Sequence, residues 1–201
     1  MKAITIRQPY ASLIARGVKT VETRSWATHY RGRIAIHAAA GWAPGWLRWH
    51  DTGSPLLGAL SDVDCGMSED PNGSYSMRPH RRGLHLGAVI ATATLADCLP
   101  MVELPPYVSI QNENAPEADE PYRKLPRNYI AVGAEAVWLV ENGGRYVSQR
   151  AFPLSGEALF GDYQPGRFGW LLTDVEPITP TPAKGRLGLW DFHAADSGVS
   201  Q

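Results

Sequence analysis

The sequence predicts a mainly β fold of the α+β class, and more specifically a small β-barrel with short flanking helices and long loop insertions. Short segments rich in Val, Ile, Thr and Ala recur along the chain, which is typical of strands. The 20 Gly and 16 Pro residues indicate many turns and long loops rather than a helical bundle. Many short strands with few helices favour a barrel.

The first twenty residues predict a strand followed by a short helix. Residues 3–6 read as the strand, and Pro9 stands where a helix accepts proline, in its first turn. Tyr10, Leu13 and Ile14 then fall on one helical face. Gly17 follows at the position where helices stop.

Two further strands are expected before residue 40. Residues 18–24 are rich in Val and Thr and alternate in character, which predicts a strand. Arg31 and Gly32 form a turn, and residues 34–38 read as the next strand. The predicted order is therefore strand, helix, strand, strand.

The rest of the chain is read as strands separated by two insertions. Residues 43–85 and 103–135 are predicted to be loop insertions, and the Gly/Ser/Asp-rich part at 61–85 is expected to be the most mobile. We expect one domain over 1–193 and a flexible tail at 194–201. A Pro-rich connector is expected at 177–182. Later strands are expected at 87–99, 136–140, 168–175 and 189–192.

Composition and charge limit the possible functions. Hydrophobic residues make up 44% and charged residues 19%, as in ordinary globular proteins. A formal net charge of -1 argues against a protein that coats extended duplex DNA through many phosphate contacts. It leaves open a pocket for one base.

The cysteines and the N-terminus favour a cytoplasmic protein. Cys65 and Cys98 form no C-x-x-C pair, so we expect no cysteine zinc site and a reducing environment. No stretch has the length of a signal peptide's apolar region at the N-terminus, and no run approaches a membrane span. We therefore expect no membrane partner.

The densest group of polar residues surrounds the predicted helix. Arg7, Lys19, Glu22 and Arg24 place four charges within eighteen residues. On a regular strand Glu22 and Arg24 share a face, because side chains repeat every two residues. One interpretation is a surface ion pair, which contributes roughly 0–1 kcal/mol and has no functional meaning. The other is a charged binding cleft.

His37 and a C-terminal cluster are the other candidates. His37 alternates with the isoleucines of its strand and is either a structural histidine or a residue of the same cleft. In the segment 182–190, Lys184 and Arg186 stand beside Gly185, where the backbone can approach another group closely. This segment is either a Gly-rich turn before a strand or a basic lip for a phosphate or ribose.

Other chemical motifs are absent from the sequence. There is no H-E-x-x-H, no G-x-S-x-G, no G-x-G-x-x-G and no phosphate-loop pattern. We therefore expect neither a metal nor a cofactor.

Three spaced blocks of residues occur in the first forty positions. They are Arg7-Gln8-Pro9-Tyr10-Ala11-Ser12-Leu13-Ile14, Gly17-x-Lys19-x-x-Glu22-x-Arg24-x-Trp26 and Arg31-Gly32-x-Ile34-x-Ile36-His37-Ala38. In this order the blocks resemble the ASCH domain of the PUA-like superfamily. A looser match continues to the C-terminus through Gly169-Trp170-Leu171-Leu172 and Lys184-Gly185-x-x-Gly188-x-Trp190.

The resemblance implies a PUA-like β-barrel that binds RNA in a cleft under the G-x-K-x-x-E-x-R segment. Some bacterial members are hydrolases, and one group deacetylates N4-acetylcytidine with a lysine base and a threonine nucleophile in a G-x-K-T-x-T-x-R motif. Lys19 and Thr20 match that motif, but Glu22 stands at the nucleophile position. This departure argues against threonine-based hydrolysis.

Our leading hypothesis is a module that binds RNA or a small nucleoside or nucleotide. Cationic side chains would contact phosphate or carbonyl oxygens, and Glu22 would accept from a base amino group. Tyr10 or Trp26 would stack on the base. The candidate ligand-binding residues are Arg7, Gln8, Tyr10, Lys19, Glu22, Arg24, Trp26, His37, Lys184 and Arg186.

Two alternatives remain open. The first is an amidohydrolase that deacylates an N4-acylated cytidine, with Lys19 as the base and Glu22 activating a water molecule. The second is a partner-binding scaffold that uses the Trp-rich stretch at 42–49.

Overall fold

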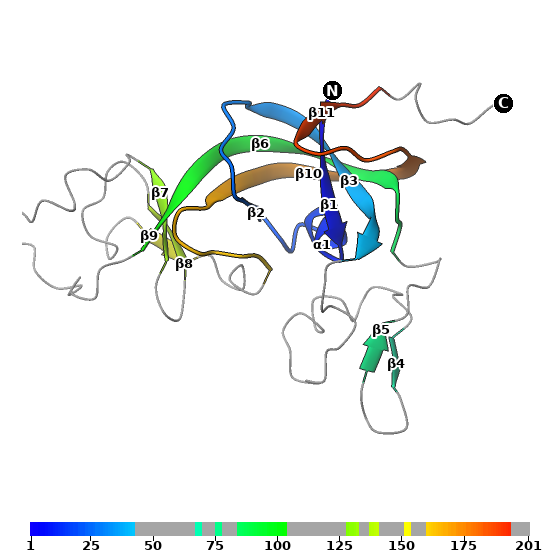
Figure 1. Cartoon of the computed structure of the whole chain (residues 1–201), viewed down its shortest axis with the longest axis horizontal. Coiled ribbons are helices and arrows are strands. Elements are labelled where there is room, and N and C mark those ends of the chain that lie inside the picture. Colours follow the sequence, from blue (N-terminus) through cyan, green and yellow to red (C-terminus); the bar gives the residue numbers. More distant parts are fainter. Residues whose placement is uncertain are drawn as a thin grey trace, which may run out of the picture. The chain divides into compact units, whose positions relative to one another are not determined.

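The chain is built mostly of strands and has one helix among the residues that the structure describes (Figure 1). The structure is a computed structural model. It describes residues 1–42, 67–69, 75–77, 84–103, 128–132, 137–140, 151–153 and 160–193. The mainly β class is thus confirmed. The predicted mobile segment at 61–85 lies mostly outside the described residues, as do the tail and the Trp-rich stretch beyond residue 42.

The strands form one nine-stranded mixed sheet and one two-stranded sheet. The main order is β11-β1-β3-β6-β7-β8-β9, and β10 pairs with β2 and β6. The elements are β1 (Lys2–Gln8), α1 (Tyr10–Ala15), β2 (Val21–Arg24), β3 (Gly32–Trp42), β4 (Met67–Glu69), β5 (Tyr75–Met77), β6 (Ala88–Glu103), β7 (Tyr129–Val132), β8 (Val137–Val140), β9 (Ala151–Pro153), β10 (Phe168–Pro182) and β11 (Leu189–Asp191).

The predicted barrel is corrected to an open sheet. Among the described strands no pairing joins β11 to β9, so the sheet is not closed. Alternation along a sequence predicts strands, but closure depends on strand tilt and on the pairing of strands that are distant in the chain. These properties leave no local signal.

The chain divides into two compact units, which we describe one at a time. Unit 1 consists of Met1–Thr20, Arg31–Leu95 and Leu172–Gln201. Unit 2 consists of Val21–Tyr30 and Ala96–Leu171. The predicted domain boundary at residue 193 stays a prediction.

Unit 1 centres on the parallel pairing of β1 with β3. In its register Ile4 lies beside Ile36 and Thr5 lies beside His37. Because side chains alternate along a strand, the isoleucines occupy one face and the threonine and histidine the other. The helix α1 contacts both strands and is itself buried through Leu13 and other apolar residues (Figure 1).

The C-terminal strand completes unit 1. β11 pairs antiparallel with β1, and the Met1 ammonium donates to the Phe192 carbonyl at 2.9 Å. Trp190 and Phe192 are buried in a cluster with Ala3, Ala35 and Val89. The two ends of the described chain are therefore held together by backbone pairing and by apolar packing.

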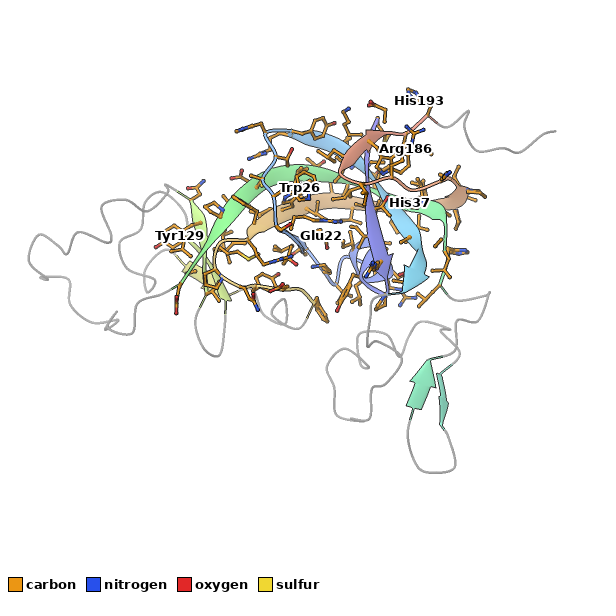
Figure 2. The ribbon with its side chains drawn as sticks, viewed as in Figure 1. Glu22, Trp26, His37, Tyr129, Arg186 and His193 are labelled. Atoms are coloured by element: carbon orange, nitrogen blue, oxygen red, sulfur yellow. The ribbon has the colours of Figure 1, made fainter. Side chains whose placement is uncertain are left out.

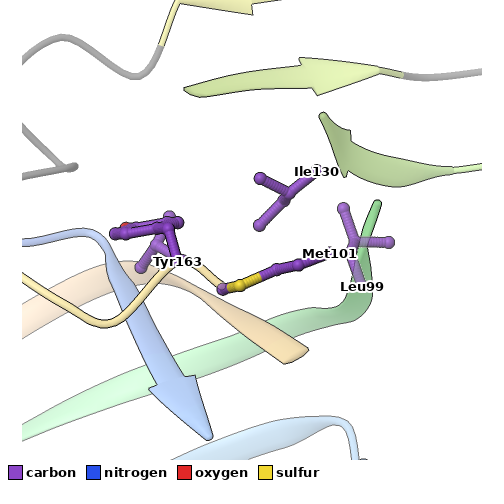
Figure 3. Close-up of a cluster of buried hydrophobic side chains, with 5 residues drawn as sticks. Leu99, Met101, Ile130 and Tyr163 are labelled. Carbon is purple, nitrogen blue, oxygen red and sulfur yellow. The ribbon is translucent and has the colours of Figure 1, made fainter. Parts of the chain in front are cut away.

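Unit 2 has its own apolar core. Residues from β2, β6, β7 and the segment before β10 meet there, and four of them are labelled in Figure 3. Gly169 packs so closely against Ile130 and Val21 that a side chain at this position would displace them. The buried members of the cluster are Val21, Leu99, Met101, Ile130 and Tyr163.

The strand and helix patterns of the sequence predict a core that includes eight residues found buried in the structure and one, Leu171 of β10, that is not fully buried. Leu171 is half-buried, whereas its neighbours Trp170 and Leu172 are buried. A run of apolar residues leaves the strand phase open by one residue, and that shift exchanges the two faces. The buried residues that alternation identified correctly are Ile4, Ile6, Leu13, Ile14, Ile34, Ile36, Val89 and Trp190.

Several element boundaries also differ from the prediction. β2 begins only at Val21, because the N–H groups of Val18 and Lys19 bond to the Leu13 carbonyl at the end of the helix. The Pro-rich stretch at 177–182 continues β10 instead of ending it. Proline fits in a strand where no partner needs its N–H. The short strands β4, β5, β7 and β9 were not predicted.

The two adjacent leucines of β10 provide a matched test of the strand phase. Leu172→Ala should lower the free energy of unfolding by about 2–5 kcal/mol, because it leaves a cavity in a buried site. Leu171→Ala should cost clearly less, since that side chain is only half-buried. Urea unfolding of both variants measures the difference. Equal losses would contradict the assigned phase.

Candidate functional site

The ten candidate residues divide between the two units. Glu22, Arg24 and Trp26 belong to unit 2. The remaining candidates belong to unit 1, and each group is described by itself. Those in unit 1 are Arg7, Gln8, Tyr10, Lys19, His37, Lys184 and Arg186.

In unit 2, Glu22 and Arg24 form an ion pair on one face of β2. Arg24 Nη2 lies 3.0 Å from Glu22 Oε1. The side chain of Glu22 is only 11% exposed and that of Arg24 is 24% exposed. The pair is therefore largely buried, unlike the solvent-exposed pair that was one interpretation of the sequence. Burial lowers the local dielectric and strengthens the attraction between the two charges.

Two tryptophans stand beside this pair. Trp170 of β10 is directly opposite Glu22 in the antiparallel register, so the two side chains share a face. The rings of Trp26 and Trp170 meet edge to face with centroids 4.7 Å apart, and Trp170 Nε1 donates to the Trp26 carbonyl at 3.4 Å. Trp26 is half-buried and Trp170 is buried. Unit 2 thus brings together the carboxylate of Glu22, the guanidinium of Arg24 and the indole rings. Glu22 and Trp26 are labelled in Figure 2.

In unit 1, Gln8 is buried and its amide is bonded to the backbone. Its Nε2 donates to the His85 carbonyl at 2.8 Å, and its Oε1 accepts from the Ser12 N–H at 3.1 Å. Ser12 is in the first turn of α1, where N–H groups have no partner within the helix. Pro9 at the N-cap offers no side-chain cap. Gln8 therefore caps the helix, while the adjacent Arg7 is exposed.

Lys19 is the most unusual residue of the group. Its side chain is 1% exposed and ranks among the largest fully buried side chains of the described chain. An ammonium group loses its hydration when it is buried, and proteins tolerate that loss only with compensating interactions. Buried ionisable side chains of this kind are over-represented at functional sites.

His37 meets the C-terminal basic segment. The ring is 1% exposed, and its Nε2 lies 2.9 Å from the Ala183 carbonyl. Because a carbonyl only accepts, Nε2 carries the hydrogen. The ring also meets Trp190 edge to face at 5.7 Å. Lys184 and Arg186, which follow Ala183 in this segment, are exposed. Arg186 and His37 are labelled in Figure 2.

Burial lowers the pKa of His37, and the hydrogen bond to the Ala183 carbonyl opposes that shift. Burial disfavours the charged imidazolium. The ring is therefore neutral near pH 7, which agrees with the tautomer assigned from Ala183.

The described residues contain no group of three or more His, Cys, Asp and Glu side chains placed to hold a metal. In the same part of the chain, no helix is long and apolar enough to cross a membrane.

Two contributors were not identified from the sequence. Trp170 lies opposite Glu22 and meets Trp26, and Thr5 lies beside His37 in the strand register. Each contact depends on pairing between segments that are far apart in the chain. No local sequence pattern predicts such a contact.

The Glu22–Arg24 pair should contribute measurably to stability. Arg24→Met keeps the length of the side chain but leaves the Glu22 carboxylate without its cation. We expect a loss of about 1–3 kcal/mol, typical of a hydrogen bond to a charged group. A double-mutant cycle with Glu22→Gln, followed by urea unfolding, isolates the interaction. A coupling energy of zero would show that the pair contributes nothing.

His37 should make stability depend on pH. Its pKa is lowered in the folded state from 6.5, so the unfolded chain binds more protons below that pH. The stabilisation is complete above about pH 6.5. It is lost as the pH falls towards the pKa of the folded state. Unfolding experiments between pH 7.5 and pH 5 should show a steeper loss for the parent than for His37→Gln. Parallel curves would contradict this assignment.

Comparison with known proteins identifies the family. The chain is similar to part of two proteins, both named activating signal cointegrator 1, one human and one from mouse.

 The human protein of that name is 54% identical over 37 residues, which are 18% of this chain and 6% of that protein. The mouse protein is 38% identical over 81 residues, or 31% of this chain and 14% of that protein. The chain therefore spans only a small part of the length of these relatives.

The family is shown by a match that covers more than half of the chain. The family model of the ASCH domain matches residues 4–115, which include the three N-terminal sequence blocks, most of β1 and all of α1, β2 and β3. Membership fits a nucleic-acid-binding role at the level of the family. The chain belongs to the ASCH domain family.

Proposed function

We propose that this protein binds RNA, or a single nucleoside or nucleotide, through the side chains of the Gly17-x-Lys19-x-x-Glu22-x-Arg24 segment. The observation that carries the proposal is the largely buried pair of Glu22 and Arg24, 3.0 Å apart on β2. A protein gains little stability from burying a charged pair, because the loss of hydration offsets the attraction. A ligand-binding role would explain why the protein buries this pair.

The pair offers a matched set of acceptors and donors to a nucleobase. A carboxylate accepts from an exocyclic amino group, as carboxylates do with the amino group of cytosine. The guanidinium fixes the orientation of Glu22, and a guanidinium is a donor group suited to a carbonyl or phosphate oxygen. Because Arg24 holds Glu22 as an acceptor, recognition of an amino group suits the pair better than proton abstraction does.

Trp26 offers a surface for stacking. Its ring meets that of Trp170 edge to face, and the residue is only half-buried. Proteins that recognise single-stranded RNA commonly stack its bases on aromatic side chains. The formal net charge of -1 supports a short single-stranded or mononucleotide ligand over a long duplex, whose binding would need many cations.

The buried Lys19 favours a second candidate, the deacylation of an N4-acylated cytidine. In that reaction Lys19 would be the base and Glu22 would activate a water molecule that attacks the acyl carbon. Binding and hydrolysis use the same segment, so a single set of variants tests both.

The test is titration of the protein with nucleosides, nucleotides and short single-stranded RNA, followed by calorimetry or fluorescence. Glu22→Gln and Lys19→Met should each weaken binding by roughly 10-fold or more, as expected for the loss of a charge-assisted hydrogen bond. Lys2→Met is the matched control, because Lys2 is an exposed lysine that pairs with Asp191. It should bind like the parent.

Two results would contradict the proposal. One is the absence of binding to every ligand at millimolar concentration. The other is equal affinity of the parent, Glu22→Gln and Lys19→Met. Turnover of N4-acetylcytidine, followed by ultraviolet absorbance and lost in both variants, would instead establish the hydrolase.

A further inference from the structure

The segment 183–188, here called the basic loop, is fixed to unit 1 at its start. The Ala183 N–H donates to the Gly87 carbonyl at 3.0 Å. The Ala183 carbonyl accepts from His37 Nε2 at 2.9 Å. The two peptide groups on either side of the Ala183 Cα atom are therefore held, the first by Gly87, which precedes β6, and the second by His37 of β3.

Gly185 packs directly on the imidazole. A Cβ atom at this position would lie 2.5 Å from His37 Cε1, 2.8 Å from His37 Nδ1 and 2.9 Å from Thr5 Oγ1. Thr5 Oγ1 in turn accepts from Trp190 Nε1 at 3.1 Å. The close approach requires glycine, and it leaves no space beside the ring for a larger group.

The same loop exposes its longer side chains. Lys184 and Arg186 are exposed, and Leu187 is 99% exposed. The loop has no carboxylate of its own, and the following Asp191 is held by Lys2 at 2.9 Å. With the described residues, neither Lys184 nor Arg186 forms an ion pair. The anchored backbone thus presents two cations to solvent.

His37 Nδ1 is the feature that makes the anchor sensitive to acid. The atom is buried and has no hydrogen-bond partner among the described residues. In the neutral ring Nδ1 is an uncharged acceptor. Protonation would place an N–H donor there, beside Gly185 and without an acceptor, and a buried unsatisfied donor is costly.

No described carboxylate compensates a protonated ring. The lowered pKa of His37 comes from burial and is opposed only by the Ala183 carbonyl, with no contribution from a charged side chain. The 88–95 part of β6 carries no titratable residue. The charged or titratable groups on the elements packed against His37 are Lys2 and Arg7 on β1, Arg33 on β3, His85 before β6, and Lys184, Arg186, Asp191 and His193 after β10.

We propose that neutral His37 is a positioning residue that locks the basic loop, so that Lys184 and Arg186 can bind phosphate groups of a single-stranded RNA, and that protonation releases the loop and weakens this binding. The proposal rests on the proposed function for its ligand. The lock itself depends only on unit 1. Two separate measurements therefore test the two parts.

The first measurement follows the loop without a ligand. Hydrogen exchange of the peptide that covers 183–190, corrected for the intrinsic effect of pH, should show loss of protection in the parent between pH 7.5 and pH 5.5. His37→Gln keeps a donor for the Ala183 carbonyl and does not titrate, so its protection should stay constant. Equal behaviour of the two proteins would overturn the lock.

The second measurement is the affinity for a fluorescent single-stranded RNA of about 8 nucleotides, within the range that small domains cover. Between pH 7.5 and pH 5.5 the parent should lose affinity relative to His37→Gln by about 5-fold or more, the lower end of typical coupling between linked equilibria. At pH 7.5, Lys184→Ala and Arg186→Ala should each weaken binding and reduce its salt dependence. Lys2→Met, which removes a cation outside the basic loop, is the control and should bind RNA like the parent.

The outcomes separate the lock from the ligand. Loss of protection with unchanged RNA affinity would overturn the role of the loop in binding. If the parent binds no RNA at any pH, the ligand assignment and the proposed function both fail, while hydrogen exchange still decides on the lock. Gly185→Ala should displace the loop at both pH values, and normal protection in this variant would also overturn the lock.

Discussion

The parallel pairing of β1 with β3 is the constraint on which unit 1 depends. It places Ile4 beside Ile36 and Thr5 beside His37. This register determines which side chains lie on each face of the two strands. The isoleucine face is buried, and α1 contacts both strands. On the other face, the C-terminal residues Trp190 and Phe192 complete an apolar cluster. Parallel strands need a crossover connection, and the segment that contains α1 provides it between β1 and β3.

Each unit buries polar groups that an apolar core would not need. In unit 1 these groups include Lys19 and His37, and in unit 2 they include Glu22. Gln8 shows that some buried polar side chains have a purely structural task, because both ends of its amide bond to the backbone. Glu22 also lies in a strand, where its intrinsic preference is poor. Local choices that oppose the fold are expected where function requires them.

The basic loop illustrates how one contact can serve both folding and recognition. Its glycine approaches the imidazole closely, and its cations point to solvent. The anchored part of the loop is thus backbone, whereas its two charged side chains are exposed to solvent. A site built on an anchored backbone loses less conformational freedom when a ligand binds.

The sequence alone determined the strand and helix pattern of the first forty residues, the shared face of Glu22 and Arg24, and the family. These features follow from local periodicity, from the two-residue repeat of a strand and from motif spacing. Only the tertiary structure decided that the sheet stays open, that Leu172 rather than Leu171 is buried, and that His37 meets Ala183 and Gly185. Those features depend on register and pairing between segments far apart in the chain, which no local pattern of residues specifies.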